Sequence, residues 1–347
     1  MFQDFKYSLL VTILCVGIAI WWGVVHPSMG VLTAIFLVVV LGIMEVSLSF
    51  DNAVVNASIL REMDEKWQQI FLTVGILIAV FGMRLVFPIV IVAVATGLGV
   101  FEVVDMALNN PTQYSQYLTA SHAGIAAFGG MFLLLVFLSF MFDHEKEVHW
   151  LGAFEEKMSA LGKLDVISVL IALVTLFLIQ EFLPMAQETR LTVLMAGLGG
   201  VILYIMVSSL DIFFENKEEG EAVVEGAKRN GLAGFLYLEV LDASFSFDGV
   251  IGAFAITNDV VIIMLGLAIG AMFVRSMTVH LVRKGTLDEY IYLEHGAHYG
   301  IGALAIIMLL SIHFHIPEVI TGLIGVSFIA FSIMSSLKYK KQLAHSA

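Results

Sequence analysis

Residues 45–52 read Glu45-Val-Ser-Leu-Ser-Phe-Asp51-Asn52, and residues 242–249 read Asp242-Ala-Ser-Phe-Ser-Phe-Asp248-Gly249. Both stretches follow the order acid, any residue, Ser, apolar residue, Ser, Phe, Asp. The similarity continues downstream in two pairs with the same spacing of nine residues, which are Gly75 with Arg84 and Gly266 with Arg275. A pattern that recurs in this way indicates one structural unit that occurs twice in the chain.

Both motifs lie inside apolar runs of a chain that is itself strongly apolar. Of its 347 residues, 59% are hydrophobic and 14% are charged, whereas soluble domains carry about 25% charged residues. Most of the chain is therefore expected to face lipid. The net charge of −13 excludes a nucleic-acid-binding protein, which needs a basic face. The single cysteine, Cys15, excludes a disulfide framework and a thiolate metal cluster.

The lengths of the apolar runs predict an all-α polytopic membrane protein. A spanning helix needs about 20 mostly apolar residues. The first run is long enough to span a bilayer and lacks a small-residue cleavage site, so we interpret it as a retained span and not as a signal peptide. The ten predicted spans are 7–25, 30–60, 69–97, 122–142, 165–184, 191–214, 231–257, 259–282, 299–315 and 317–337.

The basic residues support this number of spans. With ten spans, the even-numbered loops share one side with both termini, and 14 of the 17 Lys and Arg residues fall there. Arg190 lies on the other side, and Arg84 and Arg275 fall inside spans. Because cytoplasmic loops collect Lys and Arg, we predict a cytoplasmic (inner) membrane location with both termini in the cytoplasm.

The two motif-bearing spans are separated by an odd number of crossings, so the repeated units must cross the membrane in opposite directions. Inverted repeats are typical of secondary transporters, whose substrate sites lie near the midplane where the repeats meet. We predict a first repeat of four spans over 1–164, and a fifth span followed by the second repeat over 165–347.

Five carboxylates and two arginines lie at the predicted mid-bilayer depth, where charges are costly and by default mark an ion pathway. Full ionisation would leave a net charge of −3, which a divalent cation would neutralise together with protons on one or more acids. Oxygen donors suit magnesium, calcium or manganese, and the motifs contain neither His nor Cys, which argues against zinc and copper. The candidate metal ligands are Glu45, Asp51, Asn52, Glu239, Asp242 and Asp248, with a secondary polar lining of Ser47, Ser49, Ser244 and Ser246.

Each of these residues also has a structural interpretation. A single buried acid can serve as the partner of an arginine, and serine in a membrane helix commonly bonds the carbonyl four residues earlier. Five acids in two matched motifs favour an ion site for the group. We interpret Arg84 and Arg275 as counter-ions or gate partners, because a guanidinium repels cations. The pairs His295/His298 and His313/His315 lie near span ends, and we interpret them as hydrogen-bonded or exposed.

The spacing inside the first motif suggests an irregular backbone. Polar residues at 45, 47, 49 and 51 recur with a period of two, which suits an extended stretch better than a helix. Irregular backbone at this depth is tolerated where it is buried in protein or lines a cavity. We therefore expect a broken helix at each motif, with Gly42 and Gly249 as contributors.

The first motif, Glu45 to Asn52 followed by Ala-Val, resembles that of the TerC family, integral membrane proteins named for tellurium resistance. The counterpart in the second half is Glu239-Val-Leu-Asp242-Ala-Ser-Phe-Ser-Phe-Asp248. The sequence is similar to a divergent branch labelled as a domain of unknown function. The resemblance implies export of Mn(II) and a metal site at the six candidate ligands named above. The chain departs from the family pattern in two ways. The second motif has Gly249 at the position where the first has Asn52, and the ten predicted spans exceed the seven to nine of the core family.

We therefore expect a non-enzymatic exporter of Mn(II) that works by alternating access, in which protonation from outside releases the ion and gives proton antiport. A Ca(II) or Mg(II) transporter is the nearest alternative. A second is a non-transporting membrane partner that holds metal and helps to metallate exported enzymes. An intramembrane aspartyl protease is a third, but the chain lacks a matching Gly-x-Gly-Asp motif. The expected partners are the metal ion and the bilayer.

Overall fold

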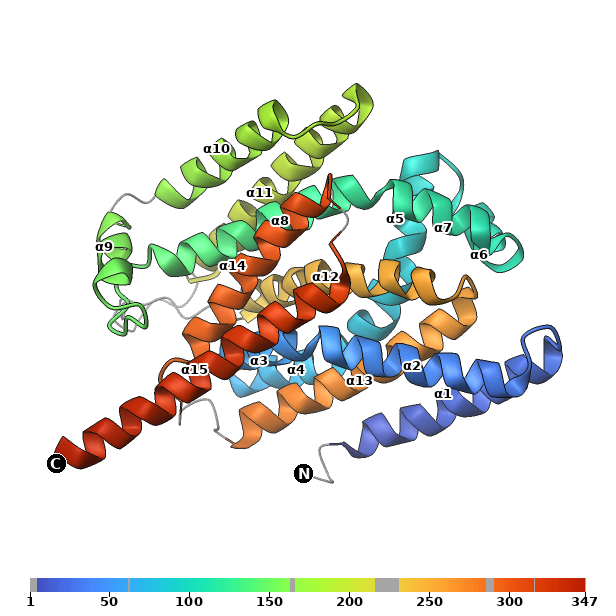
Figure 1. Ribbon diagram of the computed structural model, residues 1–347, viewed down its shortest axis with the longest axis horizontal. Coiled ribbons are helices and arrows are strands. Elements are labelled where there is room, and N and C mark those ends of the chain that lie inside the picture. The colour runs from blue at the N-terminus through green and yellow to red at the C-terminus, as the bar shows by residue number, and fades with distance from the viewer. Residues whose placement is uncertain are drawn as a thin grey trace. The chain divides into compact units, whose positions relative to one another are not determined.

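A computed structural model of the chain describes residues 5–61, 63–162, 166–215, 231–284, 290–314 and 316–346. Within some helices the side chains lie outside this description, among them those of Asp51 and Asp248. The described residues form helices and turns and contain no strand (Figure 1). The predicted all-α fold class is therefore confirmed.

The described part of the chain forms fifteen α-helices and one π-helix. In chain order they are α1 (Lys6–Val25), α2 (Val31–Leu48), α3 (Phe50–Leu60), α4 (Glu65–Leu77), the π-helix η1 (Ile78–Val86), α5 (Phe87–Thr96), α6 (Val100–Asn109), α7 (Pro111–Ala120), α8 (His122–Met141), α9 (Ala153–Leu161), α10 (Ile167–Phe182), α11 (Gln187–Glu215), α12 (Gly231–Ile256), α13 (Val260–Lys284), α14 (Leu293–Ser311) and α15 (Glu318–Ser346).

Eight helices of the described chain are long and apolar enough to cross a membrane: Lys6–Val25, Val31–Leu48, Ile78–Thr96, His122–Met141, Gln187–Ser209, Val260–Lys284, Leu293–Ser311 and Ile320–Gln342. This composition makes the chain a multi-pass membrane protein. The two remaining predicted spans correspond to α10, a shorter apolar helix of 16 residues, and to α12, which carries Glu239, Asp242 and Asp248. The number ten stays a prediction.

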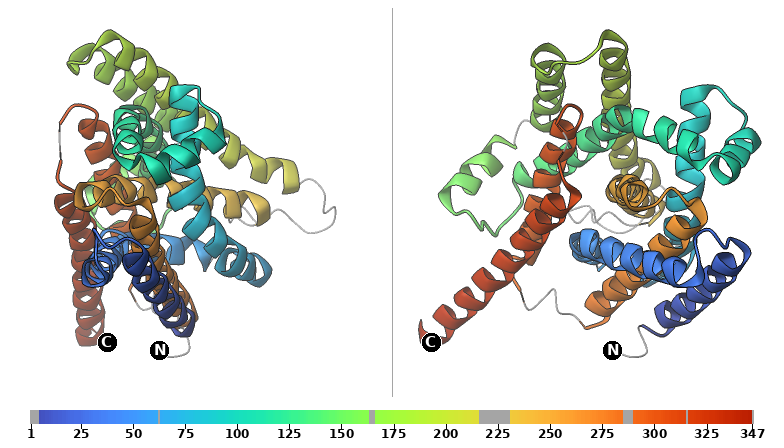
Figure 2. Two further views of the ribbon diagram at one scale, coloured as in Figure 1. Left: turned by 90° about the vertical axis from the view of Figure 1, so that its right-hand side faces the viewer. Right: turned by 45° about the vertical axis from the view of Figure 1, so that its right-hand side comes forward.

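The chain divides into two compact units. Unit 1 comprises Met1–Asn56, Gln68–His122 and Glu239–Lys284. In it α13 packs along α2 and α1, and η1 also contacts α13 (Figure 2). The Ser8 hydroxyl fixes α1 on α13 by donating to the Met272 carbonyl at 2.7 Å. Both sequence motifs, from Glu45 to Asn52 and from Asp242 to Gly249, therefore belong to one unit.

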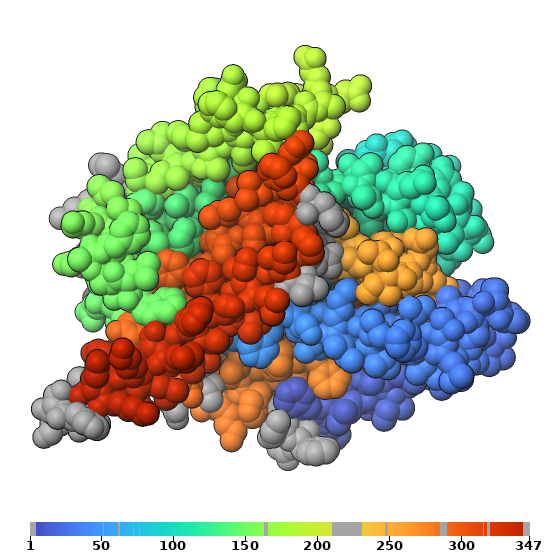
Figure 3. Space-filling view, viewed as in Figure 1, coloured from blue at the N-terminus to red at the C-terminus, as the bar shows by residue number. Residues whose placement is uncertain are grey.

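Unit 2 comprises Ala57–Trp67, Ala123–Leu238 and Gly285–Ala347. In it α14 packs against α15, and α10 pairs with α11 (Figure 2). The outward side of α15 is uncovered in the space-filling view (Figure 3). That helix exposes Leu323, Phe331 and Met334, which are side chains suited to face lipid. The predicted repeats at 1–164 and 165–347 cut across both units and stay a prediction.

The backbone at the two motifs is more regular than the sequence suggested. Helix α2 ends at Leu48 and α3 begins at Phe50, so only Ser49 interrupts the first motif. Hydrogen bonds continue there, from Ser49 N–H to the Glu45 carbonyl at 3.0 Å and from Ala53 N–H to the Ser49 carbonyl at 3.2 Å. Helix α12 runs unbroken from Gly231 to Ile256. The predicted break in the second motif is therefore wrong.

The period-two pattern misled because serine can satisfy its hydroxyl inside a helix. Ser244 donates to the Val240 carbonyl at 2.9 Å, four residues earlier. Ser47 does the same with the Ile43 carbonyl at 2.8 Å. Glycine also has another role here. Gly249 marks a position where α12 comes so close to another element that there is no room for a Cβ.

The irregular backbone lies elsewhere, in η1. This π-helical stretch connects α4 to α5, and the Phe87 N–H bonds the Gly82 carbonyl five residues earlier. Such wide turns are rare and frequently occur at functional sites. Here the wide turn carries Arg84, one of the two arginines that the sequence places at mid-bilayer.

Candidate functional site

A buried cluster of charged and amide side chains lies in unit 1. It draws Glu45 from α2, Arg84 from η1, two asparagines from α3, Glu239 and Asp242 from α12, and Arg275 from α13. The side chains of Glu45, Arg84, Glu239, Asp242 and Arg275 are each at most 7% exposed. Charges buried to this extent in a membrane protein are expensive and need partners. Those partners are visible on both sides of the cluster.

On the first side Glu45 is paired with Arg84. The Arg84 Nη2 atom forms an ion pair with Glu45 Oε1, and the Arg84 Nη1 atom donates to the Ala79 carbonyl. The Ser49 hydroxyl also donates to Glu45 Oε1, at 3.3 Å. The other oxygen, Oε2, lies 2.5 Å from where a Cβ on Gly249 would be. Glu45 is thus neutralised by one arginine and enclosed by backbone.

On the second side Asp242 accepts hydrogen bonds from two amides. Asn52 Nδ2 donates to Asp242 Oδ1 at 2.7 Å, and Asn56 Nδ2 donates to the same oxygen at 3.4 Å. Asn52 and Asn56 are four residues apart on α3, so both amides lie on one face of that helix. Asn56 was not among the ligands predicted from the sequence. The signal that could have found it is its position one helical turn after Asn52.

Glu239 lies one turn before Asp242 on α12, near Arg275. The Arg275 guanidinium carbon lies 3.7 Å from the centroid of the Phe71 ring, a cation–π contact. Gly75 makes room for both groups, because a Cβ there would be 2.5 Å from Glu239 Oε1 and 2.7 Å from Arg275 Nη2. Among the described residues, neither Glu239 oxygen has a hydrogen-bond partner. A buried carboxylate in this condition lacks the stabilisation that such groups normally receive.

The two motifs contact each other in a reciprocal way. Asn52 of the first motif bonds Asp242 of the second. In the other direction Gly249, which aligns with Asn52, lies against Glu45, which aligns with Asp242. Two further close contacts involve the downstream glycines. Gly75 lies against Glu239, and Gly266 lies against Gly42, whose Cβ would be 3.5 Å from the Gly266 carbonyl oxygen.

The remaining predicted residues divide into three groups. Ser49 joins the cluster through Glu45, as described above. Ser244 is buried but bonds its own helix, and Ser246 is buried without a hydrogen-bond partner among the described residues. Ser47 is exposed and lies apart from the cluster. Asp51 and Asp248 have side chains outside the description.

A metal site built from acids and histidines alone does not form among the described side chains. In that part of the chain no three His, Cys, Asp or Glu residues lie together in a way that could hold a metal ion. The described cluster instead combines two carboxylates, Glu239 and Asp242, with two asparagine amides. Such a set offers hard oxygen donors only, which is the chemistry that magnesium, calcium and manganese share.

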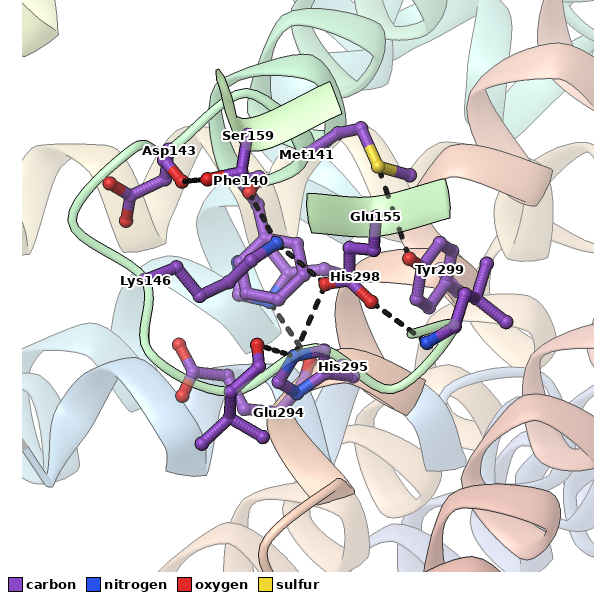
Figure 4. Close-up of polar contacts among 12 residues, drawn as sticks. Phe140, Met141, Asp143, Lys146, Glu155, Ser159, Glu294, His295, His298 and Tyr299 are labelled. Carbon is purple, nitrogen blue, oxygen red and sulfur yellow. Dashed lines mark hydrogen bonds and ion pairs between the residues drawn. The ribbon is translucent and has the colours of Figure 1, made fainter. Parts of the chain in front are cut away.

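Unit 2 contains a second buried polar cluster, centred on Glu155 of α9 (Figure 4). Its carboxylate is 0% exposed. Oε1 lies 2.6 Å from Lys146 Nζ and 3.2 Å from His295 Nε2, and Oε2 accepts the Leu151 N–H at 3.0 Å. Lys146 also donates to the Phe140 carbonyl at 3.0 Å. The cluster ties the loop after α8 to the start of α14.

These contacts determine the acidity of Glu155. Burial by itself raises the pKa of the carboxyl group. The hydrogen bonds from Lys146 and Leu151 and the neighbouring charges lower it by more, so the pKa lies below its ordinary value of 4.5. His295 bonds the Val148 carbonyl at 2.8 Å, and His298 stacks on Phe140 with ring centroids 4.0 Å apart. The interpretation of His295 as a hydrogen-bonded histidine is confirmed.

The helices and the cluster in unit 1 define a class, a multi-pass membrane protein with a buried site of acids, arginines and amides. Within that class the chain belongs to the family described as Protein of unknown function (DUF475), whose model matches residues 50–343. No curated protein and no solved structure matches the chain.

Proposed function

We propose that the protein is a transporter that exports a divalent metal cation, Mn(II) in the first place, across the cytoplasmic membrane. The observation that carries this proposal is the bond between Asn52 and Asp242, which joins the two sequence motifs inside one buried cluster. Buried acids in membrane helices mark ion pathways by default. The reciprocal contact of Gly249 with Glu45 supports an arrangement of two inverted repeats around that site.

The donor types support a hard divalent cation as the cargo. Glu239 and Asp242 together supply two negative charges, and Asn52 and Asn56 supply neutral oxygens. Arg84 neutralises Glu45, so this acid adds no net charge to the cluster. Arg275 offsets one of the two charges that remain, so the described charged side chains sum to −1. With the motif aspartates Asp51 and Asp248 the sum would be −3, which a dication and one proton would neutralise. The TerC resemblance of the motif adds manganese as the first choice, and the 14 bases on one side of the predicted topology place both termini in the cytoplasm.

Alternating access supplies the mechanism. Helices η1 and α13 bring an arginine to each half of the cluster, and the π-helical turns of η1 give one half a backbone that can change its register. Movement of one repeat against the other would expose the acids first to one side of the membrane and then to the other. Protons from outside would replace the ion on the acids and return with the emptied carrier, which gives antiport.

Flux measurements test the proposal. We expect purified protein in liposomes to move Mn(II), and we expect Asp242→Asn, Asp51→Asn and Asp248→Asn to abolish this flux. Asn109→Ala is the control, because the Asn109 side chain is exposed and, among the described residues, bonds only Asp105 of its own helix at 2.7 Å. Wild-type flux in all three aspartate variants would contradict the proposed site.

Competition between ions separates the alternatives. If Ca(II) or Mg(II) displaces Mn(II) at equal concentration, the protein is a transporter of that ion instead. If the protein binds Mn(II) without moving it and copurifies with exported enzymes, it is the non-transporting partner. Release of peptide fragments from an added membrane substrate would instead indicate the protease.

A further inference from the structure

Glu45 of the first motif and the α12 acids Glu239 and Asp242 differ in the groups that they contact. Glu45 has Arg84 and Ser49 on one oxygen. Its other oxygen faces the backbone of α12 at Gly249, and its side-chain carbons lie against α13 at Gly270. A cation would have to displace the Arg84 guanidinium to reach this carboxylate. The Glu45 carboxylate is therefore already paired with the permanent positive charge of Arg84.

Among the described side chains, Glu239 and Asp242 of α12 form no ion pair of this kind, although Arg275 lies beside Glu239. In the same part of the chain, Asp242 receives only the Nδ2 atoms of Asn52 and Asn56 through the bonds given above. Both oxygens of Glu239, which is 5% exposed, lack a hydrogen bond among the described residues. Arg275 is held over the Phe71 ring and forms no hydrogen bond with its Nε or Nη2 atoms in the same part of the chain. This half therefore contains acceptor oxygens of Glu239 and N–H donors of Arg275 that form no hydrogen bonds among the described residues.

Asn56 is the second observation that points to a ligand. Its side chain is 2% exposed, and its Oδ1 atom accepts no hydrogen bond among the described residues. An asparagine carries both a donor and an acceptor on one amide. By rotating the amide, the residue can donate Nδ2–H to Asp242 or present Oδ1 to a cation. Buried polar atoms without partners are rare and call for an explanation, and a cation between Asn56 and Glu239 provides one.

We infer that Asn56 is a further ligand of the transported cation and that the ion site lies on the second side of the cluster. Its described ligands are Glu239, Asp242, Asn52 and Asn56. Glu45 is the fixed partner of Arg84 and does not bind the ion. The two carboxylates supply two negative charges, of which the neighbouring Arg275 offsets one. Together with the two amides they offer hard oxygen donors, which fit a divalent cation of the Mn(II), Mg(II) or Ca(II) type. This inference rests on the proposed function.

Titration of the purified full-length protein with MnCl₂ tests the role of Asn56. We expect Asn56→Ala to raise the Kd for Mn(II) by about tenfold or more, which is the range seen when groups that support metal ligands are removed. The matched control is Asn109→Ala, the same chemical change at an exposed asparagine, with an unchanged Kd. Asn56→Asp keeps the size and adds a charge to the ligand set, so we expect it to lower the Kd by about tenfold at pH 8.

A double variant tests the role of Glu45. The single change would leave Arg84 buried and unpaired, so Glu45→Gln is combined with Arg84→Met. We expect this protein to retain the wild-type Kd within about threefold, because neither residue is a ligand. A loss of Mn(II) binding in the folded double variant would overturn the assignment of Glu45.

The outcomes separate this inference from the function on which it rests. If the wild-type protein binds no divalent cation, the proposed function fails. If the wild type binds Mn(II) and both Asn56 variants keep its Kd, only the present inference is overturned. Should Asn56→Ala not yield folded protein, the affinity of Asn56→Asp decides the question.

Discussion

Removal of the Lys146 ammonium group tests whether the Glu155 cluster holds unit 2 together. Lys146→Met keeps most of the side-chain length and leaves the Glu155 carboxylate, of the close contacts described above, with the Leu151 N–H at 3.0 Å and His295 at 3.2 Å. The two side chains are 7% and 0% exposed, so solvent does not screen them. Loss of one partner of a buried pair costs about 3–5 kcal/mol. The two remaining contacts place the expected value near the lower end, at about 3 kcal/mol.

Thermal unfolding in detergent, followed by tryptophan fluorescence, measures this loss. At roughly 2 °C for each kcal/mol, we expect the Tm of Lys146→Met to fall by about 6 °C. Trp150 is a local reporter, since its ring centroid lies 5.7 Å from that of Tyr299 beside the cluster. Lys157→Met is the matched control, the same substitution at an exposed position of α9, and its Tm should stay within about 1 °C of wild type.

A double variant decides whether the effect comes from an unpaired charge. Combining Lys146→Met with Glu155→Leu removes both charges, and replacement of a buried pair by apolar residues is often neutral. We expect the double variant to recover about 2 kcal/mol of the loss, because only the neutral contacts of the carboxylate are then missing. The reasoning is refuted if Lys146→Met is no less stable than Lys157→Met, or if the double variant is less stable than the single one.

Three further predictions concern pH, helix contacts and the first motif. The pKa of Glu155 is lowered in the folded state. The stability that this carboxylate contributes is therefore present above about pH 4.5 and is lost as the pH falls through the lowered pKa. The Tm of Glu155→Gln should consequently fall less on acidification than the Tm of the wild type. Gly249→Ala would place a Cβ 2.5 Å from Glu45 Oε2 and should reduce Mn(II) flux strongly. Gly17→Ala is the control, because a Cβ there would have no atom within 4 Å, and we expect it to stabilise α1 by about 0.5–1 kcal/mol. Glu45→Gln alone leaves the buried Arg84 unpaired and should cost about 3–5 kcal/mol, and recovery of Tm in the double variant with Arg84→Met distinguishes a charge effect from a packing effect.

Apolar composition predicted the helices well because lipid leaves the backbone few alternatives. A segment such as Val31–Leu48 must form its hydrogen bonds internally, so its sequence alone determines that it is a helix. The local prediction at the motifs failed for the opposite reason. Serine is compatible with an extended strand and also with a helix, where its hydroxyl can donate to the carbonyl one turn earlier. Ser47 and Ser244 form this helical hydrogen bond.

The contents of the candidate site were predictable only in part. The acids and arginines stand out because their charges are rare in apolar spans. Asn56 does not, since its role depends on Asp242, a residue 186 positions away in the chain. The Glu155 cluster likewise depends on His295, a residue far away in the chain. The charged residues that follow α8 therefore do not by themselves predict that Glu155 is fully buried. No residue pattern within Ile78–Val86 predicts the π-helical turns of η1.

The glycine at position 249 also limits how the two halves of the protein can change over evolutionary time. Two motifs that arose from one unit, as proposed above, would begin as equal copies, and later exchange of sequence between the copies could make them equal again. Here that route is closed, because Gly249→Asn would put a side chain where the Glu45 carboxylate already lies. The difference between Asn52 and Gly249 is therefore maintained as long as the Glu45 carboxylate keeps its position.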